Sequence, residues 1–198
     1  MSVVLKLSAG GDSSLRHFMH AALLALALIV VSACENARLR AVYDAFCQEN
    51  ITIPQDLLLV QDGELRDSYT IPEVPRLVYY LDSNQCSVCN ITKLQKLHVD
   101  PSEPLYVASI VQLPQKDREY VKMTIEYAGL DVDASVFLDE NDSFIKNNPF
   151  LPDDRRFHTF LLDPDGNIRL VGDPTAGDKL EKMFQETIHL INQSDETK

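Results

Sequence analysis

Cys86 and Cys89 are separated by two residues in the stretch SNQCSVCNIT, residues 83–92. Two thiols at this spacing can exchange with a substrate disulfide, form a passive bridge, or supply half of a structural zinc site. The spacing alone does not separate these three chemistries. The choice depends on the elements around the pair and on the redox state of the compartment.

A zinc site is the weakest of the three readings, because a structural zinc takes four protein ligands. The chain has 4 cysteines and 5 histidines, but it has no second Cys-x-x-Cys and no closely spaced Cys/His pair. His98 follows Cys89 by nine residues, more than two helical turns, and is poorly placed to share a metal with it. We predict neither a metal nor a small-molecule cofactor, since paired thiols carry the electrons themselves.

The N-terminal residues carry the pattern of a secretory leader. Lys6 and Arg16 precede an uncharged run of 13 residues, 21–33, that ends at Cys34. A membrane span needs about 20 apolar residues, so this run better fits the apolar core of a signal peptide, which we predict over residues 1–33. Translation from Met19, an ordinary cleaved signal peptide without lipidation and an uncleaved anchor are open alternatives.

The end of that run, Val31-Ser32-Ala33-Cys34, resembles the lipobox of bacterial lipoproteins. The resemblance implies that Cys34 becomes the lipidated first residue of a protein anchored in the bacterial cell envelope, facing the periplasm or the outer surface. Disulfides persist in that compartment, which favours redox chemistry for Cys86 and Cys89. The net charge of -12 and the lack of any basic run argue against nucleic-acid binding.

Hydrophobic periodicity predicts an α/β domain with alternating strands and helices. A one-sided apolar stripe predicts a first helix over 36–48, and three prolines and a glycine within 50–75 indicate an extended linker with one or two edge strands. Residues 141–156 are predicted to be a loop. The predicted organisation is a leader (1–33), an N-terminal helix and linker (34–71) and a main domain (72–198). The elements expected in the main domain are strands at 76–82, 104–113 and 134–140, helices at 90–98, 115–129 and 180–191, and a hairpin within 157–173 that turns at residues 164–167.

This order, with the cysteines between the first main strand and its helix, resembles the thioredoxin fold: a mixed central sheet flanked by helices, here with an N-terminal extension. The hairpin FHTFLLDPDGNIRLVG is similar to that of the TlpA-like and AhpC/TSA-like branch. Together with the lipobox and YYLDSNQCSVC, it resembles thioredoxin-like lipoproteins of Bacteroides-type bacteria over residues 72–193. Gln85 departs from the family's tryptophan, Ser87-Val88 from its Gly-Pro or Pro-Pro pair, and Phe157 or a neighbour from its cis-proline.

The resemblance implies a membrane-anchored thiol-disulfide oxidoreductase, in the reducing direction, with protein thiols and disulfides as partners. Cys86 would attack, because backbone N–H groups at the start of the following helix favour its thiolate, and Cys89 would resolve the mixed disulfide. The alternative is a non-catalytic thioredoxin-fold binding lipoprotein of a surface or uptake assembly.

Two further side chains are candidates for tuning the thiolate. His158 lies beside the expected cis-proline position and could exchange a proton with Cys86, although a solvent-exposed histidine is the simpler interpretation. Asp82 could accept a proton, or could simply end the strand, which is the simpler interpretation. Cys47, on the apolar side of the first helix, is interpreted as a small packing residue or a free thiol.

Overall fold

The computed structural model describes residues 20, 35–84, 91–113, 118–128 and 134–195. The chain divides into two compact units, residues 1–42 and 43–198. Residues 43–71, predicted to belong to an N-terminal extension, share the second unit with the sheet. Among the described residues, no helix combines the length and the apolar character needed to cross a membrane.

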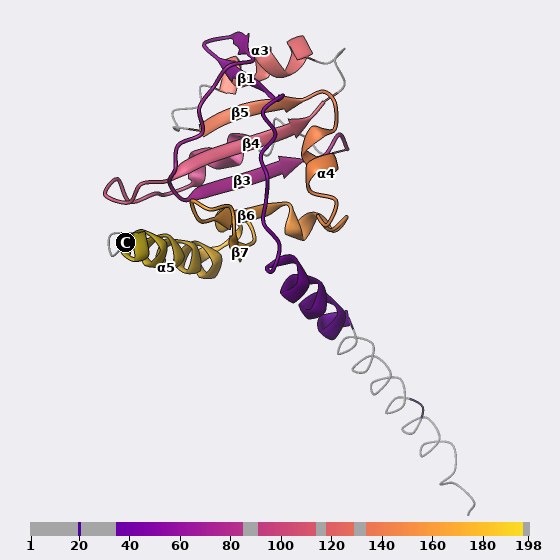
Figure 1. Ribbon diagram of the computed structural model, residues 1–198, viewed down its shortest axis with the longest axis vertical. Coiled ribbons are helices and arrows are strands. Elements are labelled where there is room, and N and C mark those ends of the chain that lie inside the picture. The colour runs from indigo at the N-terminus through magenta and orange to yellow at the C-terminus, as the bar shows by residue number, and fades with distance from the viewer. Residues whose placement is uncertain (1–19, 21–34, 85–90, 114–117, 129–133, 196–198) are drawn as a thin grey trace, which may run out of the picture. The chain divides into compact units, whose positions relative to one another are not determined.

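A mixed sheet is the framework of the second unit (Figure 1). Its seven described strands have the order β2-β1-β5-β4-β3-β6-β7. Strands β3, β4 and β5 are parallel, whereas β6 and β7 add an antiparallel hairpin beside β3, and β1 pairs antiparallel with β5 and β2. The strands are β1 Leu58–Gln61, β2 Glu64–Arg66, β3 Arg76–Leu81, β4 Tyr106–Gln112, β5 Ala134–Asp139, β6 Thr159–Leu162 and β7 Ile168–Val171.

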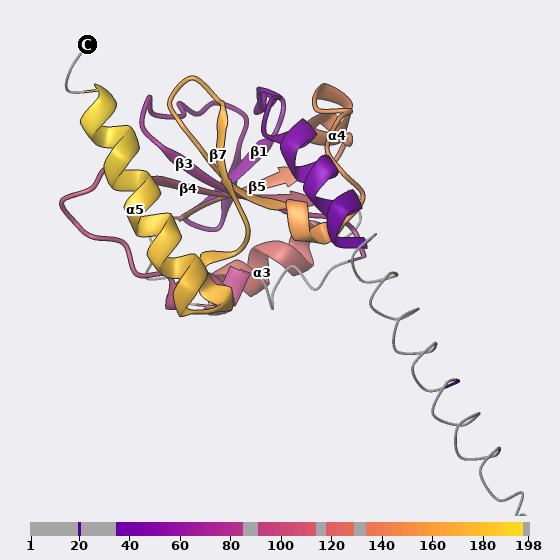
Figure 2. The same ribbon diagram turned by 90° about the horizontal axis from the view of Figure 1, so that it is seen from below.

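Helices cover both faces of the sheet. Residues 35–46 form the first described helix, and a helical turn at 91–93 leads into a short 3-10 helix. Helices α3 and α5 lie on one face and α4 on the other (Figure 2). The remaining elements are η1 Leu94–Lys96, α3 Arg118–Ala128, α4 Ser143–Asn147, η3 Arg155–Phe157, η4 Pro174–Ala176 and α5 Asp178–Asp195.

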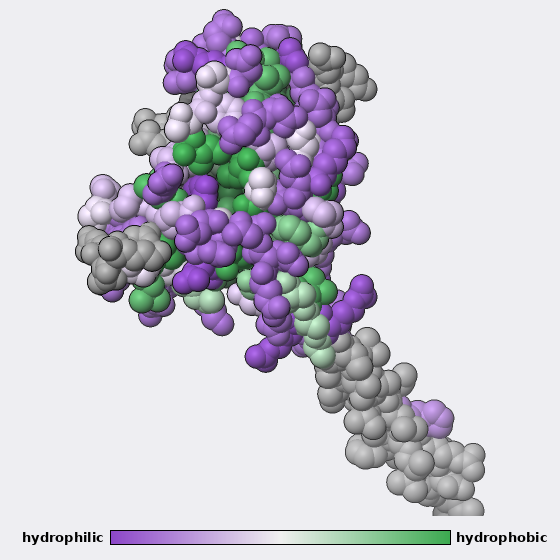
Figure 3. Space-filling model, in the orientation of Figure 1, coloured by the Kyte–Doolittle hydropathy of each residue, from purple (hydrophilic) through white to green (hydrophobic). Residues whose placement is uncertain are grey.

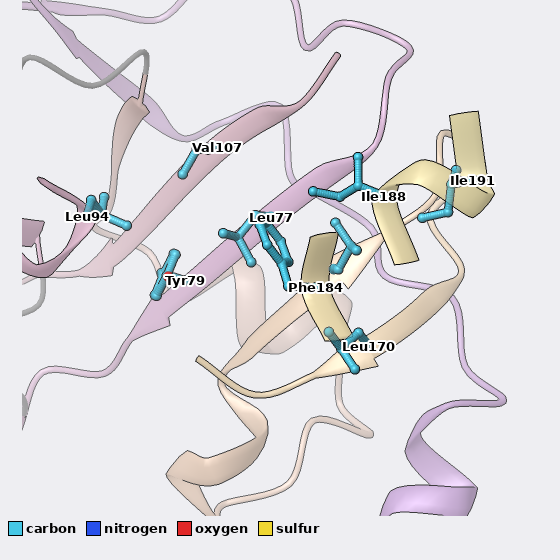
Figure 4. Packing of buried hydrophobic residues seen from close by; sticks show 9 residues of the cluster. Leu77, Tyr79, Leu94, Val107, Leu170, Phe184, Ile188 and Ile191 are labelled. Atoms are coloured by element: carbon cyan, nitrogen blue, oxygen red, sulfur yellow. The ribbon is translucent and has the colours of Figure 1, made fainter. Parts of the chain in front are cut away.

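The face under α5 holds a buried apolar cluster (Figure 4). Phe184, Ile188 and Ile191 recur every three or four residues, so they form a single stripe along α5. Leu77 and Val107 meet this stripe from β3 and β4. Each such side chain contributes about 1.5–3 kcal/mol by leaving water, which fixes α5 against the sheet.

The opposite face is covered by α4 and by residues 50–57, which cross the sheet as an extended segment (Figure 1). The amide of Thr52 donates to the side-chain oxygen of Asn148 at 2.9 Å, and the Asn148 side chain donates back to the carbonyl of Thr52 at 2.9 Å. Apolar surface shows between the polar residues over the middle of this face (Figure 3). The segment buries Ile51, Ile53 and Leu57.

The predicted fold class, a thioredoxin-type mixed sheet flanked by helices, is confirmed. The prediction of a loop over 141–156 is wrong, because this stretch contains α4 and η3. The Asp139 carboxylate accepts from the amides of Ser143 and Phe144 at 2.8 Å each, which satisfies two of the free donors at the start of α4. The Phe144 ring is fully buried, so packing stabilises a helix too short to show a period in the sequence.

Candidate functional site

The candidate site lies at the carboxyl end of β3, between the parallel β4 and the antiparallel β6. The carboxyl ends of strands, where neighbouring connections diverge, are where α/β sheets place their ligands. Cys86 and Cys89, the predicted catalytic pair, lie outside the described residues.

Asp82 is the centre of a hydrogen-bonded cluster at this end of β3. Arg155 approaches its carboxylate with both arms of the guanidinium, Nε to Oδ2 at 2.8 Å and Nη2 to Oδ1 at 2.9 Å. The amide of Asn84 donates to Oδ1 at 2.9 Å. Asp82 therefore connects the residues that follow β3 to the turn that precedes β6, and β3 ends one residue before it, at Leu81.

The turn that carries Arg155 is the 3-10 helix η3. Asp154 caps it by accepting from the amide of Arg156 at 3.0 Å, and the ring of Phe157 buries its other side. Hydrogen bonds from the side chain and the amide of Arg156 hold the pKa of Asp154 below its usual range. The capped turn therefore fixes the backbone from which the Arg155 side chain extends.

His158 follows η3 directly and is buried, with its side chain only 7% exposed. Its carbonyl accepts from the amide of Tyr80 at 2.8 Å, and its ring meets the Tyr80 ring edge to face at 5.2 Å. The interpretation of His158 as solvent-exposed is therefore wrong. The two-residue alternation of β6 begins only at Thr159, so it does not set the direction of the preceding side chain.

The two ring nitrogens of His158 have different surroundings. Nε2 lies 2.9 Å from the carbonyl oxygen of Pro152. Nδ1 is buried and has no hydrogen-bond partner within the described residues, and it lies 4.0 Å from Oδ2 of Asp82. His158 and Asp82, two predicted tuning residues, are thus brought together without a direct hydrogen bond.

Polar contacts extend the cluster to the ends of β4 and β5. Gln112 accepts from the amide of Ser83 at 3.1 Å and donates to Asp142 at 2.6 Å. Burial is the main cause that raises the pKa of Tyr80 to about 12, with added repulsion from Asp139, Asp142 and Asp82. The Tyr80 hydroxyl therefore keeps its proton at neutral pH.

Comparisons with known proteins find matches only among solved structures. No family model and no curated protein matches the chain. An uncharacterized thioredoxin-like protein from Porphyromonas gingivalis is 15% identical over 73% of this chain and 94% of its own, with a TM-score of 0.49. A putative electron transfer protein from Aquifex aeolicus is 15% identical over 72% of this chain and 97% of its own, with a TM-score of 0.49. The thioredoxin domain of a thiol-disulfide oxidoreductase from Bacteroides vulgatus is 16% identical over 59% of this chain and 80% of its own, with a TM-score of 0.42.

The strand order decides the fold: β3 lies between a parallel β4 and the antiparallel β6–β7 hairpin, and α5 follows the hairpin. The chain has a thioredoxin-like fold. The family resemblance predicts a proline a residue or two before Thr159, at Phe157 or at a neighbour, and His158 lies directly before Thr159. The described residues contain no cis peptide bond, and the His158 imidazole beside the expected proline position is buried.

Three contributors to the site were not predicted: Arg155, Gln112 and the carbonyl of Pro152. Arg155 lies 73 positions from Asp82, and no local pattern connects the two. The sequence PDDRR, residues 152–156, holds the available signal, since Asp154 two residues before Arg156 is a capping arrangement for a short turn.

The other predicted cysteines have separate places. Cys34, the predicted lipidation site, lies outside the described residues. Cys47 is a partly buried free thiol just after the first helix. Burial raises the pKa of Cys47, and a hydrogen bond with Tyr43 opposes this only in part, so the thiol stays protonated at neutral pH. No group of three or more histidine, cysteine or acidic side chains able to hold a metal occurs within the described residues.

Proposed function

We propose that the protein is a thiol-disulfide oxidoreductase of the bacterial cell envelope, with Cys86 as the attacking and Cys89 as the resolving cysteine. The observation that carries this proposal is the cluster of Asp82, Arg155 and His158 at the end of β3, because Asp82 lies four residues before Cys86. A passive disulfide bridge gains nothing from a buried imidazole nitrogen without a hydrogen bond. A reacting thiol gains a proton acceptor from it.

The proposed reaction is reduction of a protein disulfide. The Cys86 thiolate attacks one sulfur of the substrate disulfide, and the other substrate sulfur leaves as a thiol. Cys89 then attacks the Cys86 sulfur of the mixed disulfide, which releases the second substrate thiol and leaves a Cys86–Cys89 disulfide. Two electrons pass to the substrate in each cycle, and the same steps in reverse oxidise a substrate.

The proposed location follows from the N-terminal pattern. Lipidation of Cys34 would attach the protein to the envelope membrane through acyl chains, because a net charge of -12 gives no attraction to anionic lipid headgroups. Cys34→Ser should move the protein from the membrane fraction to the soluble fraction after cell breakage. Retention of this variant in the membrane would indicate an uncleaved anchor instead of a lipid.

Mixed-disulfide trapping tests the proposed reaction. Cys89→Ser should accumulate disulfide-linked complexes between Cys86 and client proteins on non-reducing gels, because the resolving thiol is gone. Cys86→Ser should accumulate none, and Cys47→Ser, a matched control at the remaining thiol of residues 43–198, should behave like the unchanged protein. A non-catalytic binding protein would instead keep its partners without either cysteine.

The reduction potential of the pair gives an independent test. Equilibration with glutathione or dithiothreitol buffers should show a reversible Cys86–Cys89 couple between about -120 and -270 mV, the range of thioredoxin-type enzymes. A bridge that resists reduction below roughly -300 mV, or thiols that never pair, would contradict the proposal.

A further inference from the structure

Three buried polar side-chain atoms lack a hydrogen-bond partner within the described residues: Arg76 Nε, Ser109 Oγ and His158 Nδ1. Arg76 still donates through Nη2 to the carbonyls of Asp163 and Pro164, and Ser109 lies in the middle of β4. His158 differs because it lies at the carboxyl end of β3, beside the proposed reaction site. An unsatisfied buried polar group costs roughly 1–3 kcal/mol, so its presence at that place calls for a chemical reason.

The hydrogen bond at the other ring nitrogen fixes the form of the imidazole. The carbonyl of Pro152 can only accept, so Nε2 of His158 must carry a hydrogen and donate it at 2.9 Å. In the neutral ring Nδ1 then holds a lone pair instead of a hydrogen. Nδ1 lies 4.0 Å from Oδ2 of Asp82, which is beyond hydrogen-bond reach.

The Asp82 carboxylate is held in place beside this lone pair. Arg155 binds both carboxylate oxygens, a two-point contact that sets orientation as well as distance. Its Oδ2 therefore faces Nδ1 of His158 and would stabilise a positive charge formed there. The Arg155 backbone belongs to the same turn, since its carbonyl accepts from the amide of His158 at 3.1 Å.

We propose that His158 accepts the proton of the attacking thiol at Nδ1, and that Arg155 is a positioning residue that holds Asp82 against the imidazolium so formed. This inference rests on the proposed function and names the proton acceptor for it. The S–H bond of Cys86 breaks, its electron pair stays on sulfur, and an N–H bond forms at Nδ1. When the thiolate attacks a disulfide, the departing substrate thiolate takes that proton back, so the imidazole returns to its neutral form.

In any pH experiment the effect of His158 must be distinguished from the titration of the ionisable groups around it. Tyr80 faces the ring from β3, while Asp82, Asp154 and Arg155 surround it from the end of β3 and from η3. With a pKa raised to about 12 by burial, Tyr80 stays neutral at pH 6 to 9, and Asp154, with its pKa lowered, stays charged. Neither group changes charge over the range in which the proposed proton transfer is measured.

The test is the rate of Cys86 alkylation by iodoacetamide between about pH 6 and pH 9, followed by mass spectrometry of the Cys86 peptide. The full chain carries Cys89→Ser, so that no Cys86–Cys89 disulfide can form. His158→Gln should slow alkylation roughly tenfold at about pH 7, and the difference should disappear near pH 9, where the thiol ionises unaided. His98→Gln, at an exposed histidine beside α5, is the matched control and should not change the rate.

Arg155 variants keep the proposal testable if His158→Gln fails to fold, because the Arg155 side chain is 52% exposed. Arg155→Gln should slow alkylation near neutral pH by a smaller factor, and Arg155→Lys should restore part of the rate, since lysine keeps the charge without the two-point contact. Superimposable pH profiles for these variants and the unchanged protein, alongside a working disulfide couple, would overturn the His158 proposal alone. Absence of any reversible couple in the unchanged protein would overturn both proposals.

Discussion

Two carboxylate–histidine pairs occupy opposite ends of the parallel strands. At the carboxyl end of β3, Asp82 lies 4.0 Å from the buried His158 without a hydrogen bond. At the amino end of β4, Glu103 accepts from His189 at 2.7 Å and also from the amide side chain of Asn192. The His189 side chain is 58% exposed, and Gln193 contacts its second ring nitrogen at 2.7 Å.

The difference between the pairs separates a structural contact from a site with chemical capacity. In the Glu103 pair both ring nitrogens of His189 have hydrogen-bond partners, and the histidine is exposed to water. The pair therefore holds the C-terminal half of α5 against the loop before β4 and leaves no ring nitrogen free. The His158 pair keeps a buried lone pair at a cost that folding alone does not require. Both places pair a carboxylate with a histidine, and burial and hydrogen-bond geometry distinguish them.

The largest expected effect comes from truncating the buried apolar residue that precedes each histidine in the sequence. Phe157 and Ile188 are buried neighbours of His158 and His189, respectively. Phe157→Ala should destabilise the protein by about 3–5 kcal/mol and Ile188→Ala by about 2–5 kcal/mol, because each leaves a cavity. Thermal unfolding measures both losses.

The comparison predicts that these two variants differ in the reactivity of Cys86 even when they lose the same free energy of unfolding. Phe157→Ala should also alter the pH profile of Cys86 alkylation, measured well below the unfolding transition, because η3 loses its buried anchor. Ile188→Ala should leave that profile unchanged. Equal changes in both profiles would show that the two ends of the sheet are not functionally distinct.

Much of the framework was predictable from local sequence patterns. The apolar run RLVYYL identifies β3 because a central strand is buried on both faces, and the regular stripe of α5 identifies a helix with one buried side. Pro164 to Asn167 marks the hairpin turn, in which Gly166 adopts a φ of +88°. These patterns identify helices, strands and turns from the sequence because each element depends on residues close together in the chain.

The site was less predictable because its contacts join distant residues. Asp82 was recognised as a candidate from its position before the cysteines, but its partner Arg155 lies in a turn of three residues. The burial of His158 depends on Tyr80 and on the carbonyl of Pro152, which the sequence does not place beside it. Tertiary packing therefore decides the exposure and the tautomer on which the proposed chemistry depends.

A smaller effect is expected from neutralising the carboxylate at the carboxyl end of β3. Asp82→Asn removes the charge that binds Arg155 but keeps the shape of the side chain. The stability loss should be about 1 kcal/mol, below the roughly 1.5–3 kcal/mol typical of hydrogen bonds to charged groups, because water reaches Arg155. The midpoint of urea unfolding measures it, with Asp153→Asn, at an exposed residue of the neighbouring loop, as the control. A loss no greater than that of the control would remove the positioning role from the Asp82–Arg155 contact.

The smallest effect concerns Glu103 and is visible only in acid. Hydrogen bonds from Asn192 and then His189 lower the pKa of the Glu103 carboxyl in the folded protein. A lowered pKa means that the ionised carboxylate contributes stability above its unfolded pKa of about 4.3, and that this contribution is lost as the pH falls through the folded value. Glu103→Gln should therefore lower the unfolding temperature slightly at neutral pH, and its unfolding temperature should converge with that of the unchanged protein in acid, as measured by scanning calorimetry across the acid range.

The same substitution should leave the rate of Cys86 alkylation unaltered. A change in that rate would connect the amino end of β4 to the thiol chemistry and so remove the contrast between the two pairs.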